Sequence, residues 1–216
     1  ICEQVGIDST EIVLDENVSK NKLLQVIDEL KHNDNINGIL LQLPLPDALK
    51  PYEMLFLSSI AADKDVDGFN PTNIGLLQCG AQYIAPCTPS GIMKMFELEN
   101  ITMSGKHVVI VGRSNIVGKP MAQLFLQHDA TVTICHSKTE NLADITRQAD
   151  ILVAAVGKPN FITKEMIKKD VIIVDVGINR VEDKLIGDVN FDDVQGIASY
   201  ITPVPGGVGL LTTATL

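Results

Sequence analysis

Residues 106–139 constrain the fold of this chain more than any other stretch. They read as an apolar run (KHVVIV), a loop that opens at Gly112, a helical segment from about Asn115 to His128, and a second β-branched run (ATVTICH). Glycines let such a loop approach a pyrophosphate, and the helix N-terminus that follows offers unpaired N–H groups and a partial positive charge. The spacing from Gly112 to Gly118 is Gly-x5-Gly rather than GxGxxG. This order predicts a Rossmann-type, dinucleotide-binding unit.

The rest of the chain predicts an α/β fold with two lobes. The runs DILVAAV and DVIIVDV follow at helix-length separations, as a doubly wound parallel sheet requires. Before them, EIVL at 11–14 and GILLQLPLP at 38–46 read as strands of a small parallel sheet. Ser19 is a predicted cap for a helix over SKNKLLQVIDELKHN, while PYEMLFLSSI and GIMKMFELEN read as further helices. We interpret PCTPSG as turn-rich and DKDVDGFNPTNIG as a loop.

The second strand of the dinucleotide unit favours NADP over NAD. NAD-specific sheets usually place an acidic residue at the end of that strand to accept the ribose hydroxyls. Here the strand ends in His136-Ser137-Lys138, without an acid. Arg113 in the loop and Ser137 together provide charge-assisted hydrogen bonds suited to a 2′-phosphate. The alternative, an ordinary surface arginine and a capping serine, stays open at this point.

The amino-acid composition limits the classes of partner and ligand that the chain can bind. A formal net charge of −10 argues against a nucleic-acid surface. No apolar run reaches the roughly 18 residues of a membrane span, and no basic, hydrophobic leader is visible. The cysteines form no CxxC pair and the histidines are dispersed, so we expect no metal site. We expect a cytoplasmic protein without membrane attachment, although a start at Ile1 leaves an organellar leader upstream open.

Five peculiar segments carry a resemblance over essentially the whole chain. Together they resemble the bifunctional methylenetetrahydrofolate dehydrogenase/methenyltetrahydrofolate cyclohydrolase family. The resemblance implies NADP-dependent oxidation of 5,10-methylenetetrahydrofolate and hydrolysis of the methenyl product to 10-formyltetrahydrofolate, in the one-carbon metabolism that supplies purine biosynthesis. The segments are LLQLPLP at 40–46, DKDVDGFNPTNIGLL at 63–77, PCTPSG at 86–91, GRSNIVGKP at 112–120 and ITPVPGGVG at 201–209.

The resemblance also implies domains and assembly. A small parallel α/β catalytic domain would comprise residues 1–88 plus about 206–216, and a Rossmann-type NADP domain residues 89–205. The substrate would be a tetrahydrofolate derivative, free or polyglutamylated, and the protein a homodimer formed through its nucleotide domain.

On the folate side, the resemblance assigns catalytic roles to two residues. Asp67 would bind the amino and ring N–H donors of the pterin, for which a carboxylate offers paired acceptors. Gln42 would lie beside the catalytic lysine of the family. Without the family, Asp67 reads as a loop cap, Gln42 as a buried amide and PVPGGVG as a tight turn. The implied folate-binding residues are Leu41, Gln42, Leu43, Asp67, Pro205, Gly206, Gly207, Val208 and Gly209.

On the cofactor side, Ile178 would lie beside the nicotinamide and Thr88 near the junction of the two ligands. Arg113 and Ser137 would contact the 2′-phosphate, and no metal is implied. The implied cofactor-binding residues are Gly112, Arg113, Ser114, Ser137, Ile178 and Thr88.

One departure from the family concerns a Tyr-x-x-x-Lys pair. In the family this pair precedes the segment that matches ICEQVGI, and the chain contains neither residue. We therefore expect a fragment clipped at both ends and deficient as a cyclohydrolase. Two alternatives stay open: another two-lobed NADP dehydrogenase, such as one acting on a hydroxy-cyclohexene acid, and a non-catalytic NADP/folate-binding module. The sequence upstream of Ile1 would separate the enzyme from the module.

Overall fold

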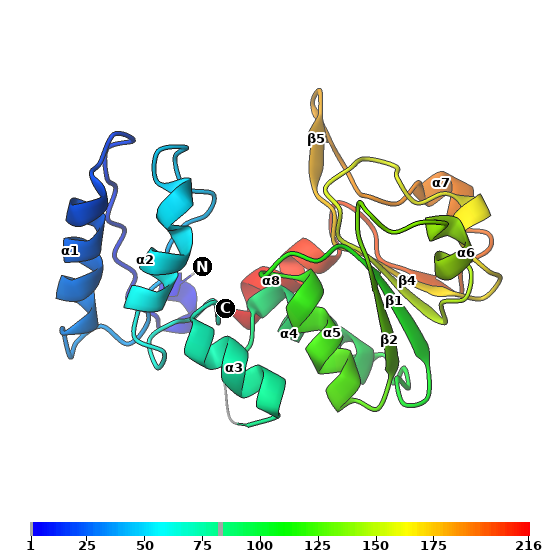
Figure 1. The fold of residues 1–216 in the computed structure, drawn as a ribbon, viewed down its shortest axis with the longest axis horizontal. Coiled ribbons are helices and arrows are strands. Elements are labelled where there is room, and N and C mark those ends of the chain that lie inside the picture. The colour runs from blue at the N-terminus through cyan, green and yellow to red at the C-terminus, as the bar shows by residue number, and fades with distance from the viewer. Residues whose placement is uncertain (1, 82–83) are drawn as a thin grey trace.

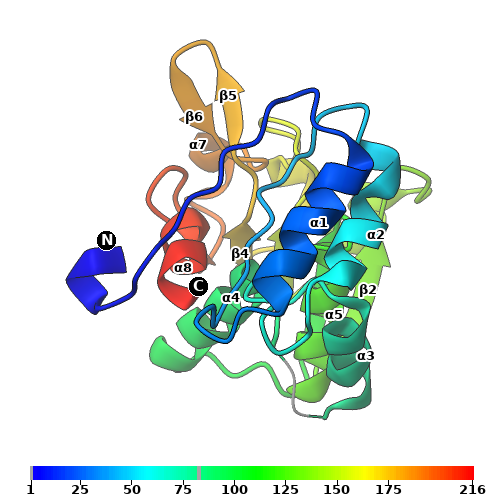
Figure 2. The same ribbon diagram turned by 90° about the vertical axis from the view of Figure 1, so that its left-hand side faces the viewer.

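The computed structural model describes residues 2–81 and 84–216 and divides them between two lobes (Figure 1). Outside the sheet lobe, its helices are η1 (Cys2–Val5), α1 (Lys20–Lys31), η2 (Lys50–Tyr52), α2 (Glu53–Ser59), α3 (Pro71–Cys79), α4 (Cys87–Leu98) and α8 (Val208–Thr215). Helices α1 and α2 pack side by side in the first lobe (Figures 1 and 2). Helices α3, α4 and α8 lie between this pair and the sheet, with α8 against α4.

The second lobe is built on a five-stranded parallel sheet in the order β2-β1-β3-β4-β7. Its strands are β1 (His107–Val111), β2 (Thr131–Cys135), β3 (Ile151–Ala154), β4 (Ile172–Asp175) and β7 (Tyr200–Ile201). The connecting helices are α5 (Gly118–Gln127), α6 (Leu142–Thr146), η3 (Lys164–Met166) and α7 (Phe191–Val194). The predicted doubly wound sheet is therefore confirmed, as is the helix after the glycine loop.

Both faces of this sheet are covered, which explains its unbroken apolar strands. Val108 and Ile110 of β1 face a core made with α4, α5 and α8, where Phe96 and Phe125 meet edge to face at 5.6 Å. Val109 and Val111 of the same strand face the opposite core, to which α6 and α7 contribute. Because the central strands β1, β3 and β4 are buried on both faces, period-2 alternation is absent from their sequences and apolar, largely β-branched residues fill both sides.

In the first lobe helices α1 and α2 are as expected, but the small sheet is not. Ser19 Oγ accepts from the N–H of Lys22 at 3.2 Å and caps α1. The predicted strand at 11–14 is wrong: the segment is irregular and Val13 is 81% exposed. In 38–46 the described structure keeps one parallel bridge, between Ile39 and Asp65. Apolar runs stay extended without forming a sheet where no neighbouring strand supplies hydrogen-bond partners.

Two segments interpreted as turns or loops begin helices instead. Asn70 caps α3 by accepting from the N–H of Thr72 at 2.7 Å, and Pro71 occupies the first helical position, where its fixed φ suits a helix. Helix α4 starts at Cys87, inside the turn-rich PCTPSG.

A hairpin of β5 (Asn179–Val181) and β6 (Lys184–Ile186) was not predicted and stands away from the body of the lobe (Figures 1 and 2). No helix in the described ranges combines the length and apolar character needed to cross a bilayer.

Candidate active site

The strand order places a ligand crevice at the carboxyl ends of β1 and β3. The chain runs from β1 to β2 on one side and to β3, β4 and β7 on the other, so the order reverses between β1 and β3. In open α/β sheets, ligands bind outside the strand ends at such a switch point. Gly112 directly follows β1 at this edge and Ala155 directly follows β3.

The glycine loop fits closely between these strand ends and α5. Gly112 has φ of +135°, and a Cβ there would lie 2.9 Å from the carbonyl carbon of Ala155. A Cβ on Gly118, the first residue of α5, would lie 2.7 Å from the carbonyl carbon of Gly112. Both positions therefore exclude a side chain, because backbone rather than a movable side chain occupies the space. The loop from Gly112 to Gly118, here called the cradle, thus has the close backbone approach that dinucleotide-binding loops use for a pyrophosphate.

Polar groups predicted to hold the cofactor surround this cradle. Ser114 Oγ accepts from the N–H groups of Val117 and Gly118 at 3.1 and 3.3 Å, which fixes the approach to α5. The Gly112 N–H donates to Cys135 O at 2.9 Å and joins the loop to the end of β2. Arg113 in the loop and Ser137 in the turn after β2 are both exposed. Their side chains are thus accessible to an anion at this edge.

Predicted folate residues line a cavity of about 230 Å³ between the lobes. Gln42 and its neighbours Leu41 and Leu43 line it from the first lobe, as does Asp67. Ile116 of the glycine loop and Thr212 of α8 line it as well. The cavity therefore joins the two lobes and reaches the dinucleotide loop.

The two acids of the DVDG segment have different environments. Asp65 is 1% exposed and its Oδ2 accepts from the N–H of Asn70 at 2.7 Å and from Asn73 Nδ2 at 3.0 Å, which fastens the loop to α3. Asp67 is half-buried and lines the cavity. Burial raises the pKa of Asp67, and the negative charge of Asp65 raises it further. Asp65 thus holds the loop in place, and Asp67 is available to a ligand.

Helix α8 connects the two predicted ligand sites. Thr88 Oγ1 and Thr212 Oγ1 lie 2.8 Å apart, so a hydrogen bond joins α4 to α8 beside the cavity. A Cβ on Gly209 would lie 3.3 Å from Cδ1 of Ile178, whose side chain is 61% exposed. The residue predicted beside the nicotinamide therefore contacts the segment predicted to hold folate.

Not every predicted folate residue lines the cavity. Leu41, Gln42, Leu43 and Asp67 are brought together there, whereas the described lining from the C-terminal segment comes from Thr212, Thr213 and Leu216 rather than from 205–209. Residues 205–209 instead form the turn into α8 and its first residues.

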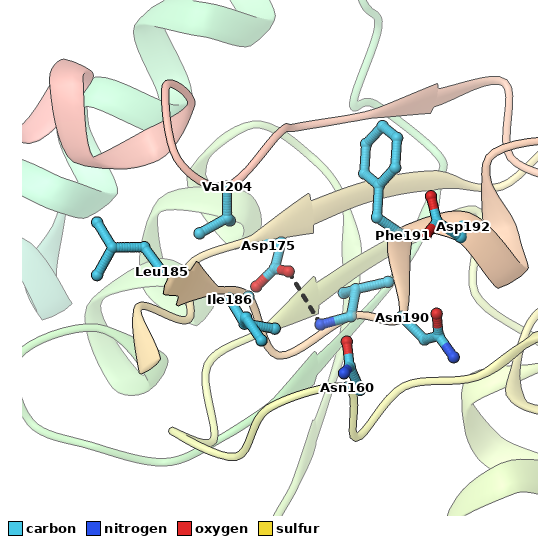
Figure 3. A pocket seen from close by; sticks show the side chains of 10 residues that line it. Asn160, Asp175, Leu185, Ile186, Asn190, Phe191, Asp192 and Val204 are labelled. Carbon is cyan, nitrogen blue, oxygen red and sulfur yellow. Dashed lines mark hydrogen bonds between the residues drawn. The ribbon is translucent and has the colours of Figure 1, made fainter. Parts of the chain in front are cut away.

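Sequence reasoning missed a second hollow of about 260 Å³ at the base of the β5–β6 hairpin (Figure 3). Figure 3 shows the Asp175 carboxylate in the middle of the residues that line it. Asp175 is the last residue of β4 and is 3% exposed, and Asp188 just after β6 is fully buried. An acid that ends an apolar strand was the available signal. Among residues 2–81 and 84–216, no group of three or more His, Cys, Asp or Glu side chains is placed to hold a metal ion.

Comparisons with known proteins agree with this geometry. Residues 1–67 match the catalytic domain of tetrahydrofolate dehydrogenase/cyclohydrolase, and residues 86–216 match its NAD(P)-binding domain. The bifunctional protein FolD of Caldicellulosiruptor saccharolyticus is 52% identical over 220 residues, which cover 100% of this chain and 78% of that protein. FolD of Lysinibacillus sphaericus is 54% identical over 216 residues, covering 100% of this chain and 75% of the relative.

Solved structures give the same result. The bifunctional methylenetetrahydrofolate dehydrogenase/cyclohydrolase of Campylobacter jejuni superposes with a TM-score of 0.96 at 50% identity, covering 99% of this chain and 76% of that one. The Trypanosoma brucei enzyme, solved with NADP cofactor and inhibitor, superposes with a TM-score of 0.93 at 37% identity, covering 99% and 75%. The chain belongs to the tetrahydrofolate dehydrogenase/cyclohydrolase family.

Proposed function

We propose that this protein oxidises 5,10-methylenetetrahydrofolate with NADP and hydrolyses the methenyl product to 10-formyltetrahydrofolate. The observation that carries the proposal is the cavity between the lobes, which Gln42, Asp67 and Ile116 of the dinucleotide loop line together. A folate held by the first lobe would thus lie next to a cofactor held by the second. The Campylobacter jejuni relative, which is 50% identical and bears both activities in its name, supports it.

The residues around the glycine loop suit NADP. The close backbone approach at Gly112 and Gly118 shapes the loop between β1 and α5 for a pyrophosphate, and Arg113 and Ser137 would hold the 2′-phosphate. When bound, NADP supplies the hydride acceptor. The chain contributes distance and orientation, and Ile178, exposed beside α8, would limit where the nicotinamide ring can lie.

Asp67 and Gln42 would orient the folate. A half-buried carboxylate can accept two N–H groups from the pterin edge, and such donors favour its ionised form against the burial that raises its pKa. Gln42 Nε2 donates to Leu43 O at 2.8 Å, which holds the amide against its own backbone. The amide oxygen is then an acceptor on a fixed support at the cavity wall.

The proposal is tested by steady-state kinetics on the natural protein and on Asp67→Asn. NADPH formation from 5,10-methylenetetrahydrofolate should be readily measured for the unaltered protein. Asp67→Asn should raise the KM for folate about 10- to 100-fold, since a hydrogen bond to a charged group contributes about 1.5–3 kcal/mol. Asp63→Asn, an exposed acid in the same segment, is the matched control and should behave as the unaltered protein. A folded protein that forms no NADPH would refute the activity, and equal KM values for both variants would refute the role of Asp67.

We also propose the domain division and assembly that the resemblance implies. Residues 1–88 with 206–216 would form the folate-binding unit and 89–205 the NADP unit, supported by the position of Thr212 and Thr213 at the cavity. Two copies would associate through the nucleotide domain, where Ile134 on edge strand β2 is 39% exposed. Light scattering of the purified protein checks the dimer, and a monomeric mass would contradict it. The folate would be used free or polyglutamylated, and its one-carbon unit would supply purine synthesis.

A further inference from the structure

Asp188 is a buried carboxylate that organises the loop after β3. Its Oδ2 accepts from the N–H groups of Val156 and Gly157 at 2.6 and 2.9 Å. Its Oδ1 accepts from the N–H of Lys158 at 2.8 Å and from Asn179 Nδ2 at 2.9 Å. Four donors from two separate segments therefore converge on one side chain that is fully buried. Such donors compensate the cost of burying an ionised group.

Asp175 holds the segment that carries Asp188. Asp175 Oδ1 accepts from the N–H groups of Gly177 and Asp188, each at 2.9 Å, and Oδ2 accepts from the N–H of Val189 at 2.9 Å. Its own N–H donates to Thr202 Oγ1 at 2.8 Å. Asp175 thus links the end of β4, the segment after the hairpin and the segment that leads toward α8.

Glycines provide the room for both carboxylates. A Cβ on Gly177 would lie 2.6 Å from the backbone nitrogen of Asp188 and still closer to its carboxyl group. A Cβ on Gly187 would lie 2.7 Å from Cγ of Asp175 and 3.0 Å from Cγ2 of Val204. Each carboxylate therefore packs over a glycine next to the other, and the two form a single interlocked unit.

The segments that this pair fixes border the proposed dinucleotide site. Residues 156–158 follow Ala155, against which Gly112 of the cradle packs. Gly177, bonded to Asp175, immediately precedes Ile178, which contacts Gly209 at the start of α8. The hollow in Figure 3 is lined by Asp175 together with Leu185 and Ile186 of the hairpin.

We propose that Asp188, held by Asp175, is a positioning residue for the dinucleotide. Asp188 fixes loop 156–158 and the Gly177–Ile178 turn, which together form one rigid wall of the cofactor site. The inference rests on the proposed function, because it assumes that this crevice takes NADP. The side chain itself does not touch the cofactor; it acts through the backbone that it anchors. An ionised carboxylate suits the task, because both of its oxygens accept and each bonds to two donors here.

The test compares Asp188→Asn with the unaltered natural protein. The amide keeps one accepting oxygen but presents an NH₂ group to N–H donors, so half of the anchor is lost without a change of volume. We expect the Kd for NADPH, followed by its fluorescence, and the KM for NADP to rise about 10- to 100-fold, the order expected for a misplaced binding group. The KM for folate should rise far less than the KM for NADP, because neither Asp188 nor its donors line the cavity that Gln42 and Asp67 line. Amide exchange at 156–158 should quicken in the cofactor-free protein.

Two further variants keep the inference falsifiable. Asp150→Asn is the matched control: its carboxylate accepts from the His107 N–H at 2.8 Å and from Lys168 Nζ at 2.6 Å at the opposite end of β1 and β3. It should lower stability without changing NADPH binding. Should Asp188→Asn fail to fold, Asn179→Ala removes one of the four donors and should weaken NADPH binding by a few-fold. NADPH affinity equal to that of the unaltered protein in the folded variants would overturn the inference, whereas an unaltered protein that binds no NADPH would overturn the proposed function.

Discussion

Substituting Gly118 with alanine tests whether the glycine loop is a cradle closed by backbone contact. In an open helix, glycine to alanine stabilises by about 0.4–1 kcal/mol because it restricts the unfolded chain. At Gly118 the new Cβ would lie 2.7 Å from the carbonyl carbon of Gly112 and 2.9 Å from Cα of Arg113. The carbonyl oxygen of Gly112 would lie nearer still, so restoring an ordinary separation of about 3.4 Å shifts the start of α5 from the loop by about 1 Å. Overpacking of this kind costs about 1–3 kcal/mol, so we expect a net loss of about 1 kcal/mol.

The same shift should weaken cofactor binding. The N–H groups at the start of α5 would move relative to the loop, and a misplacement approaching 1 Å costs about tenfold or more in function. The assays are NADPH titration by fluorescence and thermal unfolding by circular dichroism, in which 1 kcal/mol corresponds to about 2–4 °C for a chain of this size. Gly75→Ala is the matched control, because Gly75 lies inside α3 and a Cβ there meets nothing within 4 Å. Equal stabilisation of both variants, with unchanged NADPH affinity, would show that the backbone of the Gly112 loop does not exclude a side chain at Gly118.

Asp67→Asn should raise stability at neutral pH while it weakens folate binding. Because the folded-state pKa of Asp67 is raised, its contribution to stability is complete below the unfolded pKa of about 4 and is lost as pH rises through the folded pKa. The melting-temperature gain of the variant should therefore grow from acid to neutral pH, and a gain independent of pH would contradict the assignment. Arg113→Ala should reduce the NADP:NAD preference measured by kcat/KM, and an unchanged ratio would show that the arginine does not bind the 2′-phosphate.

The sheet lobe was predictable because its signals are local. Strands buried on both faces are continuous β-branched runs, and Gly112 marks the point where the first of them ends against a helix. In the first lobe the same reasoning failed at 11–14, since an apolar run does not reveal whether a neighbouring strand exists. Helix α3 was missed although Asn70-Pro71 is a cap followed by a first helical position, because the surrounding glycine and aspartates were interpreted as a loop.

The candidate site, too, was predicted only in part from the sequence. The grouping of Gln42 and Asp67 at one cavity followed from motifs that a resemblance had already associated. The roles of Asp65, Asp175 and Asp188 were not predicted from the sequence. The place of a buried carboxylate is explained only by the hydrogen-bond donors around it. Those donors lie up to 32 residues away, as in the bond from Val156 to Asp188. Sequence spacing carries no information on such pairs until the fold is known.

In the proposed function, the cavity between the lobes brings a folate against a dinucleotide held by the Gly112 loop. The most direct test of this arrangement uses 5,10-methylenetetrahydrofolate with deuterium on the methylene carbon and mass spectrometry of the reduced cofactor. Direct transfer between the two neighbouring ligands predicts NADPH that carries the deuterium, in an amount equal to the folate oxidised. Unlabelled NADPH, or no reduced cofactor from a folded protein that binds both ligands, would contradict the account.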